Sequence, residues 1–309
     1  MTVSASSAAA SPIVVLDDRA RALFHPDAPL RRLATGARWS EGPVWIEETR
    51  SVLWSDIPND RILRWSQREG LAVWQQGVEF TNGHTRDAAG NILHCSHGLR
   101  AVYRTGIEPG AREIVVDRYQ GKRFNSPNDI VVKSDGTIWF TDPPYGLIVP
   151  EEGHGGDAEL DDCYVFRFAP ASGELTAVTN LPHHPNGLAF SPDESLLYVS
   201  DTGGALPGHG TQHCIHVFDV IGGTQLANGR VFAEIAPGVP DGFRVDVRGR
   251  IYTSAADGVH VLAADGAPLA RIPVPEKVGN VCFGGPSRDT LFIAASTSLY
   301  AIDLATRGC

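Results

Sequence analysis

The hydrophobic and polar positions along the chain repeat one pattern six times. Each copy opens with a polar residue, often followed by Gly, and continues into a short apolar stretch. It then turns at Asp, Gly, Pro or Ser and enters a second apolar stretch ten or eleven positions after the opening residue. The copies open at intervals of 41, 46, 58, 55 and 39 residues, at Glu41, Asn82, Asn128, Asn186, Asp241 and Asn280. Short apolar stretches between turn residues are typical of β-strands, so each copy predicts a strand pair.

Two further apolar stretches follow each copy and predict a third and a fourth strand. The third strands are RILRWS, AVYRT, CYVFRFA, CIHVFDV, GVHVLA and SLYAIDL, and the fourth strands are LAVWQQ, REIVVD, ELTAVTN, RVFAEI and LARIPV. The last copy has no fourth strand after it, whereas LRRLAT lies unassigned just before Glu41. The pattern therefore predicts an all-β, six-bladed β-propeller with four-stranded blades, closed into a ring by this N-terminal strand.

The order of the strands decides which loops share a face of the propeller. Loops between second and third strands lie on the same face as the opening residues. The two longest insertions, 146–162 and 203–213, are both of this kind. Long loops on one face of a rigid scaffold usually carry function, so this face is expected to hold the site, although the role of each loop stays open.

The six opening residues are expected to form a ring around the mouth of the propeller, because the innermost strands line its axis. All six carry side-chain oxygen atoms. Asn and Asp also precede Gly in ordinary turns, which would account singly for Asn82, Asn186 and Asp241. Glu is not a turn residue, so this alternative explains Glu41 poorly.

Two carboxylates that converge on one axis repel each other unless one is protonated or a cation lies between them. Carboxylate and amide oxygens are the ligands that Ca²⁺ and Mg²⁺ prefer. The ring contains no thiolate or imidazole, so zinc is less favoured. The pattern therefore predicts one divalent cation, with Ca²⁺ first and Mg²⁺, Mn²⁺ or Zn²⁺ as alternatives.

The composition fits a globular protein whose partner is small. The chain has 309 residues, 42% of them hydrophobic, with 33 Gly and 21 Pro. Its net charge of −10 argues against a nucleic-acid partner. No apolar run approaches the roughly 18 residues that span a bilayer, so no membrane partner is expected either. Residues 1–12 are small and polar and are predicted to be disordered, which leaves 13–309 as a single propeller domain. The oligomeric state stays open.

The cysteines give an indication of the cellular compartment in which the protein works. There are five, widely separated and without CxxC spacing: Cys95, Cys163, Cys214, Cys282 and Cys309. We expect free thiols, which favours a cytoplasmic location, with the periplasm as the alternative. The sequence contains no GxSxG elbow and no GxGxxG or Walker motif, so neither a serine-hydrolase triad nor a nucleotide site is indicated.

The chain resembles the gluconolactonase and senescence-marker-protein (regucalcin) family from about Leu30 to the C-terminus. The motifs that carry the resemblance, in order, are EGPVW, RFNSPNDIVVKSDGTIWFTDP, PNGLAFSPDESLLYVSD, PDGFRVDVRG and NVCFGG. The resemblance implies a six-bladed propeller that hydrolyses aldonolactones with a divalent metal in its central cavity. It implies metal ligands at Glu41, Asn186 and Asp241, with Asn128 near both metal and substrate. In some members a sugar-contacting Arg lies two residues before this Asn, where the present chain has Ser126 and carries Arg123 three residues further upstream.

Further substrate contacts are expected where second strands end at the same mouth. Four such residues are Asp56, His97, Asp142 and Asp201. Each could cap a turn or contact substrate, and we predict substrate contacts for His97 and Asp201, and for Asn82 and Asn128 of the ring. Tyr145, at the start of the 146–162 loop, could pack on a sugar ring.

Two further groups of residues have plainer interpretations. The histidines of the long loops and their neighbours, His183, His184, His209 and His213, could hold a second metal or could be solvated. The six tryptophans are predicted to pack between blades.

These observations predict metal-dependent hydrolysis of a gluconolactone-like sugar lactone to the aldonic acid. The metal would stabilise the negative charge that develops on the lactone carbonyl oxygen as water adds. Asp241 is the candidate base, and a metal-bound water is the alternative. Two other functions stay open for the same ring: hydrolysis of a phosphotriester or fluorophosphate with Asp241 as nucleophile, and calcium binding without catalysis. The identity of the lactone also stays open.

Overall fold

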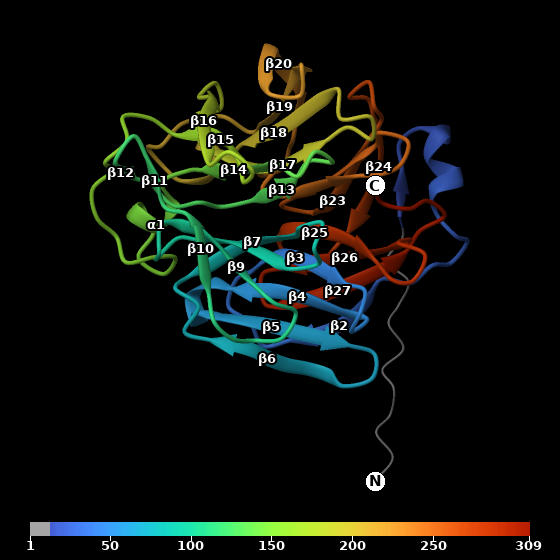
Figure 1. Cartoon of the computed structure of the whole chain (residues 1–309). Coiled ribbons are helices and arrows are strands. Elements are labelled where there is room, and N and C mark those ends of the chain that lie inside the picture. The colour runs from blue at the N-terminus through green and yellow to red at the C-terminus, as the bar shows by residue number, and fades with distance from the viewer. Residues whose placement is uncertain (1–12) are drawn as a thin grey trace.

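The fold is a ring of six antiparallel sheets around a central axis. It is seen in a computed structural model that describes residues 13–309 (Figure 1). Residues 1–12, for which disorder is predicted above, lie outside the described residues. The six-bladed β-propeller predicted from the repeat is thereby confirmed.

Each blade runs from an innermost first strand to an outermost fourth strand. Blade 1 contains β3 (Ser40–Ile46), β4 (Ser51–Asp56), β5 (Arg61–Ser66) and β6 (Gly70–Gln76). Blade 2 contains β7 (Thr81–Arg86), β8 (Ile92–Ser96), β9 (Ala101–Thr105) and β10 (Glu113–Val116). Blade 3 contains β13 (Ile130–Val132), β14 (Ile138–Asp142), β15 (Tyr164–Ala169) and β16 (Glu174–Thr179).

The second half of the ring follows the same order. Blade 4 contains β17 (Pro185–Phe190), β18 (Leu196–Asp201), β19 (Cys214–Ile221) and β20 (Gln225–Glu234). Blade 5 contains β21 (Phe243–Val245), β22 (Ile251–Ala255), β23 (Gly258–Leu262) and β24 (Pro268–Pro273). Blade 6 contains β25 (Val278–Gly284), β26 (Thr290–Ala295), β27 (Ser298–Asp303) and β2 (Arg31–Thr35).

The N-terminal strand closes the ring as predicted. Strand β2 pairs antiparallel with β27, with Arg31 opposite Ala301 and Thr35 opposite Ser298. A second N-terminal strand, β1 (Val14–Val15), pairs with β24 and gives blade 5 a fifth strand, followed by the 3₁₀ helix η1 (Asp18–Leu23). The sequence pattern did not predict β1, because two residues are too few to show an alternation.

The remaining elements lie in the loops. They are the 3₁₀ helices η2 (Ile57–Asn59) and η3 (Gly203–Ala205), the helix α1 (Tyr145–Ile148), and a ribbon of β11 (Arg118–Tyr119) and β12 (Lys122–Arg123). Helix α1 and η3 belong to the two long insertions predicted to share the face of the opening residues. These insertions therefore have local structure of their own.

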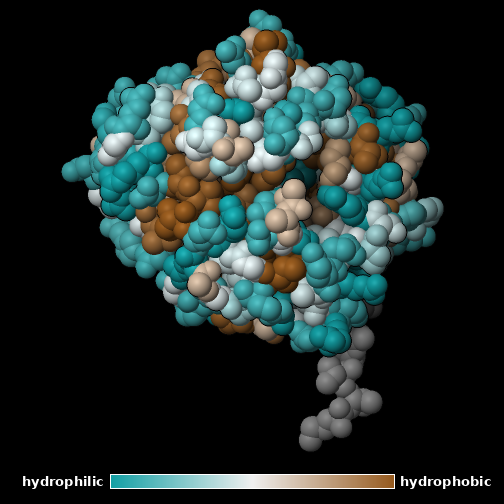
Figure 2. All heavy atoms as spheres, viewed as in Figure 1, coloured by the Kyte–Doolittle hydropathy of each residue, from teal (hydrophilic) through white to brown (hydrophobic). Residues whose placement is uncertain are grey.

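Tryptophan and other large side chains fill the space between strands. Trp54 and Trp139 are fully buried, and the Trp45 ring stacks on Phe292 with centroids 5.6 Å apart. This confirms blade packing for these tryptophans. Figure 2 shows hydrophilic side chains over much of one face, with hydrophobic ones in separate patches. Within residues 13–309, no helix is long and apolar enough to cross a membrane.

Candidate active site

The opening residues of the six blades come together because neighbouring first strands approach at backbone distance. A methyl group placed on Gly42 would lie 2.2 Å from the carbonyl oxygen of Asn82, and one on Gly83 would lie 2.4 Å from that of Asn128. Of the four glycines that follow ring residues, only Gly42 has a positive φ, at +55°. Gly83, Gly187 and Gly242 are therefore glycine because a side chain there would clash with the neighbouring blade. A turn that requires a positive φ does not explain these three positions.

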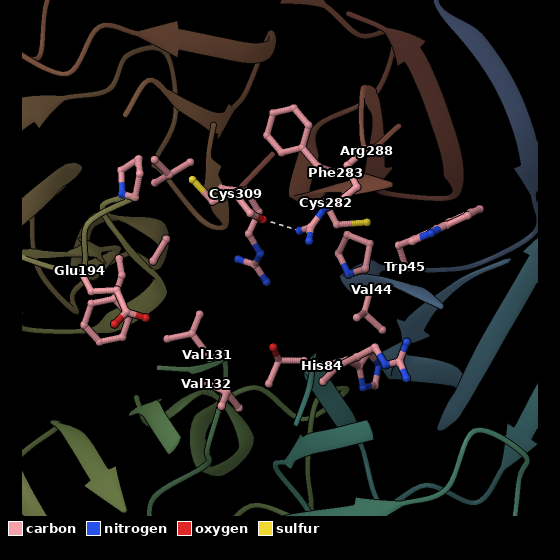
Figure 3. A pocket seen from close by; sticks show the side chains of 18 of the residues that line it. Val44, Trp45, His84, Val131, Val132, Glu194, Cys282, Phe283, Arg288 and Cys309 are labelled. Carbon is pink, nitrogen blue, oxygen red and sulfur yellow. Dashed lines mark hydrogen bonds between the residues drawn. The ribbon is translucent and has the colours of Figure 1, made fainter. Parts of the chain in front are cut away.

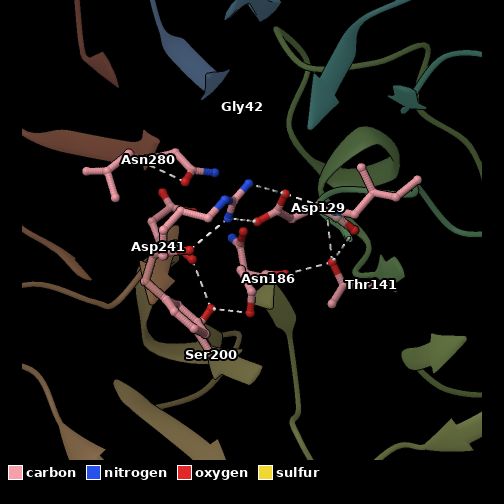
Figure 4. A network of polar contacts seen from close by, with 12 residues as sticks. Gly42, Asp129, Thr141, Asn186, Ser200, Asp241 and Asn280 are labelled. Atoms are coloured by element: carbon pink, nitrogen blue, oxygen red, sulfur yellow. Dashed lines mark hydrogen bonds and ion pairs between the residues drawn. The ribbon is translucent and has the colours of Figure 1, made fainter. Parts of the chain in front are cut away.

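Hydroxyl groups of the second strands fix the backbone of the ring. Each of three hydroxyls donates to the carbonyl oxygen of the ring residue in the next blade. These bonds run from Ser55 to Asn82 (2.7 Å), from Thr141 to Asn186 (2.7 Å) and from Ser200 to Asp241 (2.9 Å), and two of them are visible in Figure 4. Because each bond joins two blades, the ring side chains start from a rigid frame.

The two carboxylates of the ring are desolvated and act on each other. Burial raises the pKa of Glu41 well above its ordinary value, and the nearby negative charge of Asp241 raises it further. Burial also raises the pKa of Asp241, to about 6, opposed by the positive charge of Lys277 and by a hydrogen bond from Asn186. In the absence of a cation, one of these two groups would hold a proton near neutral pH.

Two side-chain oxygen atoms of the ring have no hydrogen-bond partner, which suits a divalent cation. Glu41 Oε2 accepts from the N–H of Gly42 at 3.0 Å, whereas Glu41 Oε1 and Asn82 Oδ1 are buried without a hydrogen bond. Asn280 differs, because its Oδ1 accepts from the N–H of Val281 at 2.8 Å. Within residues 13–309, no group of three or more His, Cys, Asp or Glu side chains forms a metal cluster. Amide oxygens must therefore complete any cation site, and Asn128 and Asn186 are the amides that the sequence predicts for it.

A largely buried ion pair lies next to the ring. Arg244 donates from Nη1 and Nη2 to the two carboxylate oxygens of Asp129, at 3.0 and 3.3 Å. Asp129 is only 1% exposed and directly follows the ring residue Asn128. Burial lowers the pKa of Arg244, but the charge and hydrogen bonds of Asp129, with a smaller effect of the charge of Glu41, raise it above its ordinary value, so the guanidinium compensates negative charge near the ring.

The predicted substrate residues His97 and Tyr145 border the ring. The Nε2 atom of His97 lies 3.3 Å from Nδ2 of Asn82, and its Nδ1 lies 2.9 Å from the carbonyl oxygen of Glu152. Burial lowers the pKa of His97 to about 4, so this ring is neutral at pH 7. The hydroxyl of Tyr145 lies 2.5 Å from Oγ1 of Thr202, which also accepts from Nδ2 of Asn186 at 3.3 Å.

The strand-end aspartates are occupied with backbone groups. Asp201 accepts from the N–H groups of His183, His184 and Gly203 at 2.6–3.1 Å, and thus anchors the second long loop. Asp142 accepts from two N–H groups in the same way, and Asp56 pairs with Arg61. These contacts are those of capping, which was the alternative for this set. Substrate binding by Asp201 stays a prediction without a supporting contact.

The loop 146–162 brings an unpredicted carboxylate, Glu152, to the mouth. Ser126 Oγ accepts from the N–H of Gly146 at 3.0 Å, so the residue that replaces the family's Arg anchors this loop. The far side of the loop is held by a contact between Nε2 of His154 and Oε2 of Glu79, at 2.7 Å. Burial and the charge of Asp241 raise the pKa of Glu152 to about 7, and the charge of Lys277 opposes them. Loop length was the only sequence signal for this residue.

The histidines near the long loops do not assemble as metal ligands. The rings of His183 and His184 stack at 4.7 Å, and His209 lies 5.9 Å from His184. Nδ1 of His213 is 3.0 Å from the carbonyl oxygen of Ile235. The absence of a His, Cys, Asp or Glu metal cluster within residues 13–309 includes this group, so the structure gives a second metal no support.

A hollow lies at the other end of the axis. It measures about 750 Å³ and is lined by the far ends of the first strands, among them Trp45, His84, Phe190 and Phe283 (Figure 3). None of the six ring residues lines it, whereas Arg244 does. Arg244 therefore borders this hollow, while its partner Asp129 directly follows the ring residue Asn128, and the ring holds the better candidate chemistry.

Comparison with known proteins agrees with this geometry. The family model described as "SMP-30/Gluconolactonase/LRE-like region" matches residues 39–297. A gluconolactonase of Zymomonas mobilis is 33% identical over 96% of this chain and 87% of its own length. The pentonolactonase XacC of Haloferax volcanii is 28% identical over 86% and 84%. The solved structure of a gluconolactonase from Xanthomonas campestris superposes with a TM-score of 0.88 at 40% identity, over 95% of this chain and 94% of that one. The chain therefore belongs to the SMP-30/gluconolactonase/LRE-like family.

Proposed function

We propose that this protein, a lactone hydrolase by its family and its relatives, opens an aldonolactone to the aldonic acid with the help of one divalent cation. The observation that carries the proposal is the convergence in one ring of the buried Glu41, whose Oε1 has no hydrogen-bond partner, and the half-buried Asp241, whose charges act on each other. Glu41, Asn186 and Asp241 would hold the cation, and Asn128 would face both cation and substrate. Oxygen-only ligands favour Ca²⁺ over softer ions.

The chemistry needs charge stabilisation and a proton carrier. When bound, a divalent cation would polarise the lactone carbonyl and stabilise the negative charge of the tetrahedral intermediate. Asp241 takes a proton from the attacking water as the new C–O bond forms. When the ring C–O bond breaks, the same carboxyl returns that proton to the leaving alkoxide, so one water is consumed and no proton is lost.

The surrounding residues would orient the sugar. His97 is neutral and lies beside Asn82, so the two side chains together offer donors and acceptors for hydroxyl groups. Tyr145 is held by Thr202 and is fixed next to the ring residue Asn186. These contacts hold the side chains that would face the sugar in place before the substrate binds.

A lactone panel tests the proposal. Acid release from aldonolactones is measured after chelation, and again after separate re-addition of Ca²⁺, Mg²⁺, Mn²⁺ and Zn²⁺. We expect turnover to vanish on chelation and to return best with Ca²⁺. Turnover that is unaffected by thorough chelation would contradict the metal dependence, and lack of turnover with any lactone would contradict the function.

Substitutions in the ring separate cation binding from proton transfer. Asp241→Asn keeps an oxygen of similar size but removes the charge and the proton acceptor. At saturating cation, its kcat is expected to stay about 10²- to 10⁴-fold below wild type. Glu41→Gln and Asn186→Ala remove cation ligands without removing the base, so excess cation should largely restore the activity of these two variants. Full recovery of Asp241→Asn at high cation would contradict its role as the base.

A further inference from the structure

A single lysine, Lys277, lies at the mouth of the propeller. The chain has only three lysines, Lys122, Lys133 and Lys277. Lys133 lies 3.0 Å from Glu194 and 3.4 Å from Asp135, whereas Lys277 takes part in no ion pair within residues 13–309. Its Nζ instead lies 5.1 Å from the centroid of the Trp39 ring. Trp39 therefore serves as a platform for this cation.

The backbone that carries Lys277 is fixed against the ring. Its carbonyl oxygen accepts from the N–H of Ser296 at 2.9 Å, and the neighbouring Glu276 accepts from Thr297 and Tyr300 at 2.7 Å. Two residues further on, a methyl group placed on Gly279 would lie 2.2 Å from Oε1 of Glu41. The backbone of Lys277 is therefore held in place close to the carboxylate of Glu41.

The place of Lys277 in the chain brings it to the mouth. Trp39, under its ammonium, directly precedes strand β3, which carries Glu41, and Gly279, two residues after Lys277, contacts Glu41. Lys277 remains exposed, so its hydrogen-bond donors are available to a ligand.

We propose that Lys277 is a specificity-determining residue that donates hydrogen bonds to hydroxyl groups of the bound lactone, with Trp39 holding the ammonium in place. This inference rests on the proposed lactone hydrolysis. It also favours polyhydroxylated lactones over lactones without hydroxyl groups, because the ammonium offers hydrogen-bond donors to hydroxyl oxygens.

The test compares two lactones that share a six-membered ring and differ in their hydroxyl groups. For Lys277→Met, kcat/KM with glucono-δ-lactone should fall by about 10- to 100-fold, mainly through KM, because charge-assisted hydrogen bonds to hydroxyls are lost. With δ-valerolactone, which has no hydroxyl groups, the change should stay below about threefold on the same reasoning. Lys277→Arg keeps the charge and donors and should recover part of the loss. Lys122→Met removes an exposed lysine from the β12 ribbon and is the matched control for charge.

The outcomes distinguish this inference from the function on which it rests. Equal losses with both lactones would mean that Lys277 acts at the reacting carbonyl, and would overturn the inference. Unchanged kinetics with both would overturn it as well, while lactone hydrolysis by the wild type would still stand. If the wild-type protein opens neither lactone, the proposed function fails and the role of Lys277 fails with it.

Discussion

Replacing Arg244 with Met should destabilise the whole propeller, because it leaves a buried carboxylate without its cation. Asp129 is 1% exposed, and its two oxygens accept from Nη1 and Nη2 of Arg244 at 3.0 and 3.3 Å. Met fills part of the vacated volume with an apolar chain but offers no donor. The remaining contact of that carboxylate is the N–H of Ile130, at 2.9 Å from Oδ1. The folded state therefore bears a desolvated negative charge that the unfolded chain exposes to water.

The expected size follows from the burial of the pair. Breaking a buried ion pair by removing one partner costs about 3–5 kcal/mol. The entropy of unfolding is about 2.1 cal/mol/K per residue, so for a chain of 309 residues this cost lowers Tm by about 5–8 °C. Arg230 and Asp219 form a comparable pair at 3.1 Å, but their side chains are 50% and 32% exposed. Because exposed pairs contribute about 0–1 kcal/mol, Arg230→Met should lower Tm by less than about 2 °C.

The measurement is thermal unfolding followed by circular dichroism and calorimetry, on Arg244→Met, Arg230→Met and the double variant Asp129→Asn/Arg244→Met. The double variant removes the unpaired charge and should regain at least half of the lost stability. Equal Tm values for the Arg244→Met and Arg230→Met proteins would refute the reasoning. A double variant no more stable than Arg244→Met would refute the claim that the buried charge causes the loss.

Three further predictions concern closure, protonation and thiols. Removing residues 1–36 deletes β2 and exposes the edge of β27, so the truncated protein should aggregate or unfold without cooperativity in size-exclusion and thermal assays; a soluble, cooperative product would count against closure. Burial lowers the pKa of His84 from 6.5 to about 3. Between pH 6.5 and pH 3 the unfolded protein therefore binds a proton at His84 that the folded protein does not bind. The stability that His84 contributes is present above pH 6.5 and is lost as pH falls through this range. His84→Gln should therefore lose less stability than wild type between pH 7 and pH 5 in urea titrations, and parallel losses would disprove the linkage. A chromogenic thiol reagent should find five free cysteines in the unfolded, unreduced protein, whereas three would indicate a disulfide.

The fold and the position of the ring follow from the sequence. The turn residues and the first two strands of each copy are local properties that appear within about 16 residues of an opening residue, and the third and fourth strands follow in the same order after each copy. Counting strands was enough to assign β2 to blade 6, because a propeller must close. Glu41 and Asp241 could be placed on one axis for the same reason, since they open equivalent strands of different blades.

Only the tertiary structure decided which partners surround that ring. Arg244 and Asp129 lie 115 positions apart, and His97 reaches Glu152 across 55 positions, so no local pattern could pair them. The structure also showed that Asp201 anchors a loop and that Gly83, Gly187 and Gly242 permit blade contact. Lys277 and Trp39 come from opposite ends of the chain and meet because β2 closes the ring beside them. Such contacts depend on how blades pack in three dimensions, whereas the sequence by itself determines the strands, their order and the oxygen-bearing residues that open them.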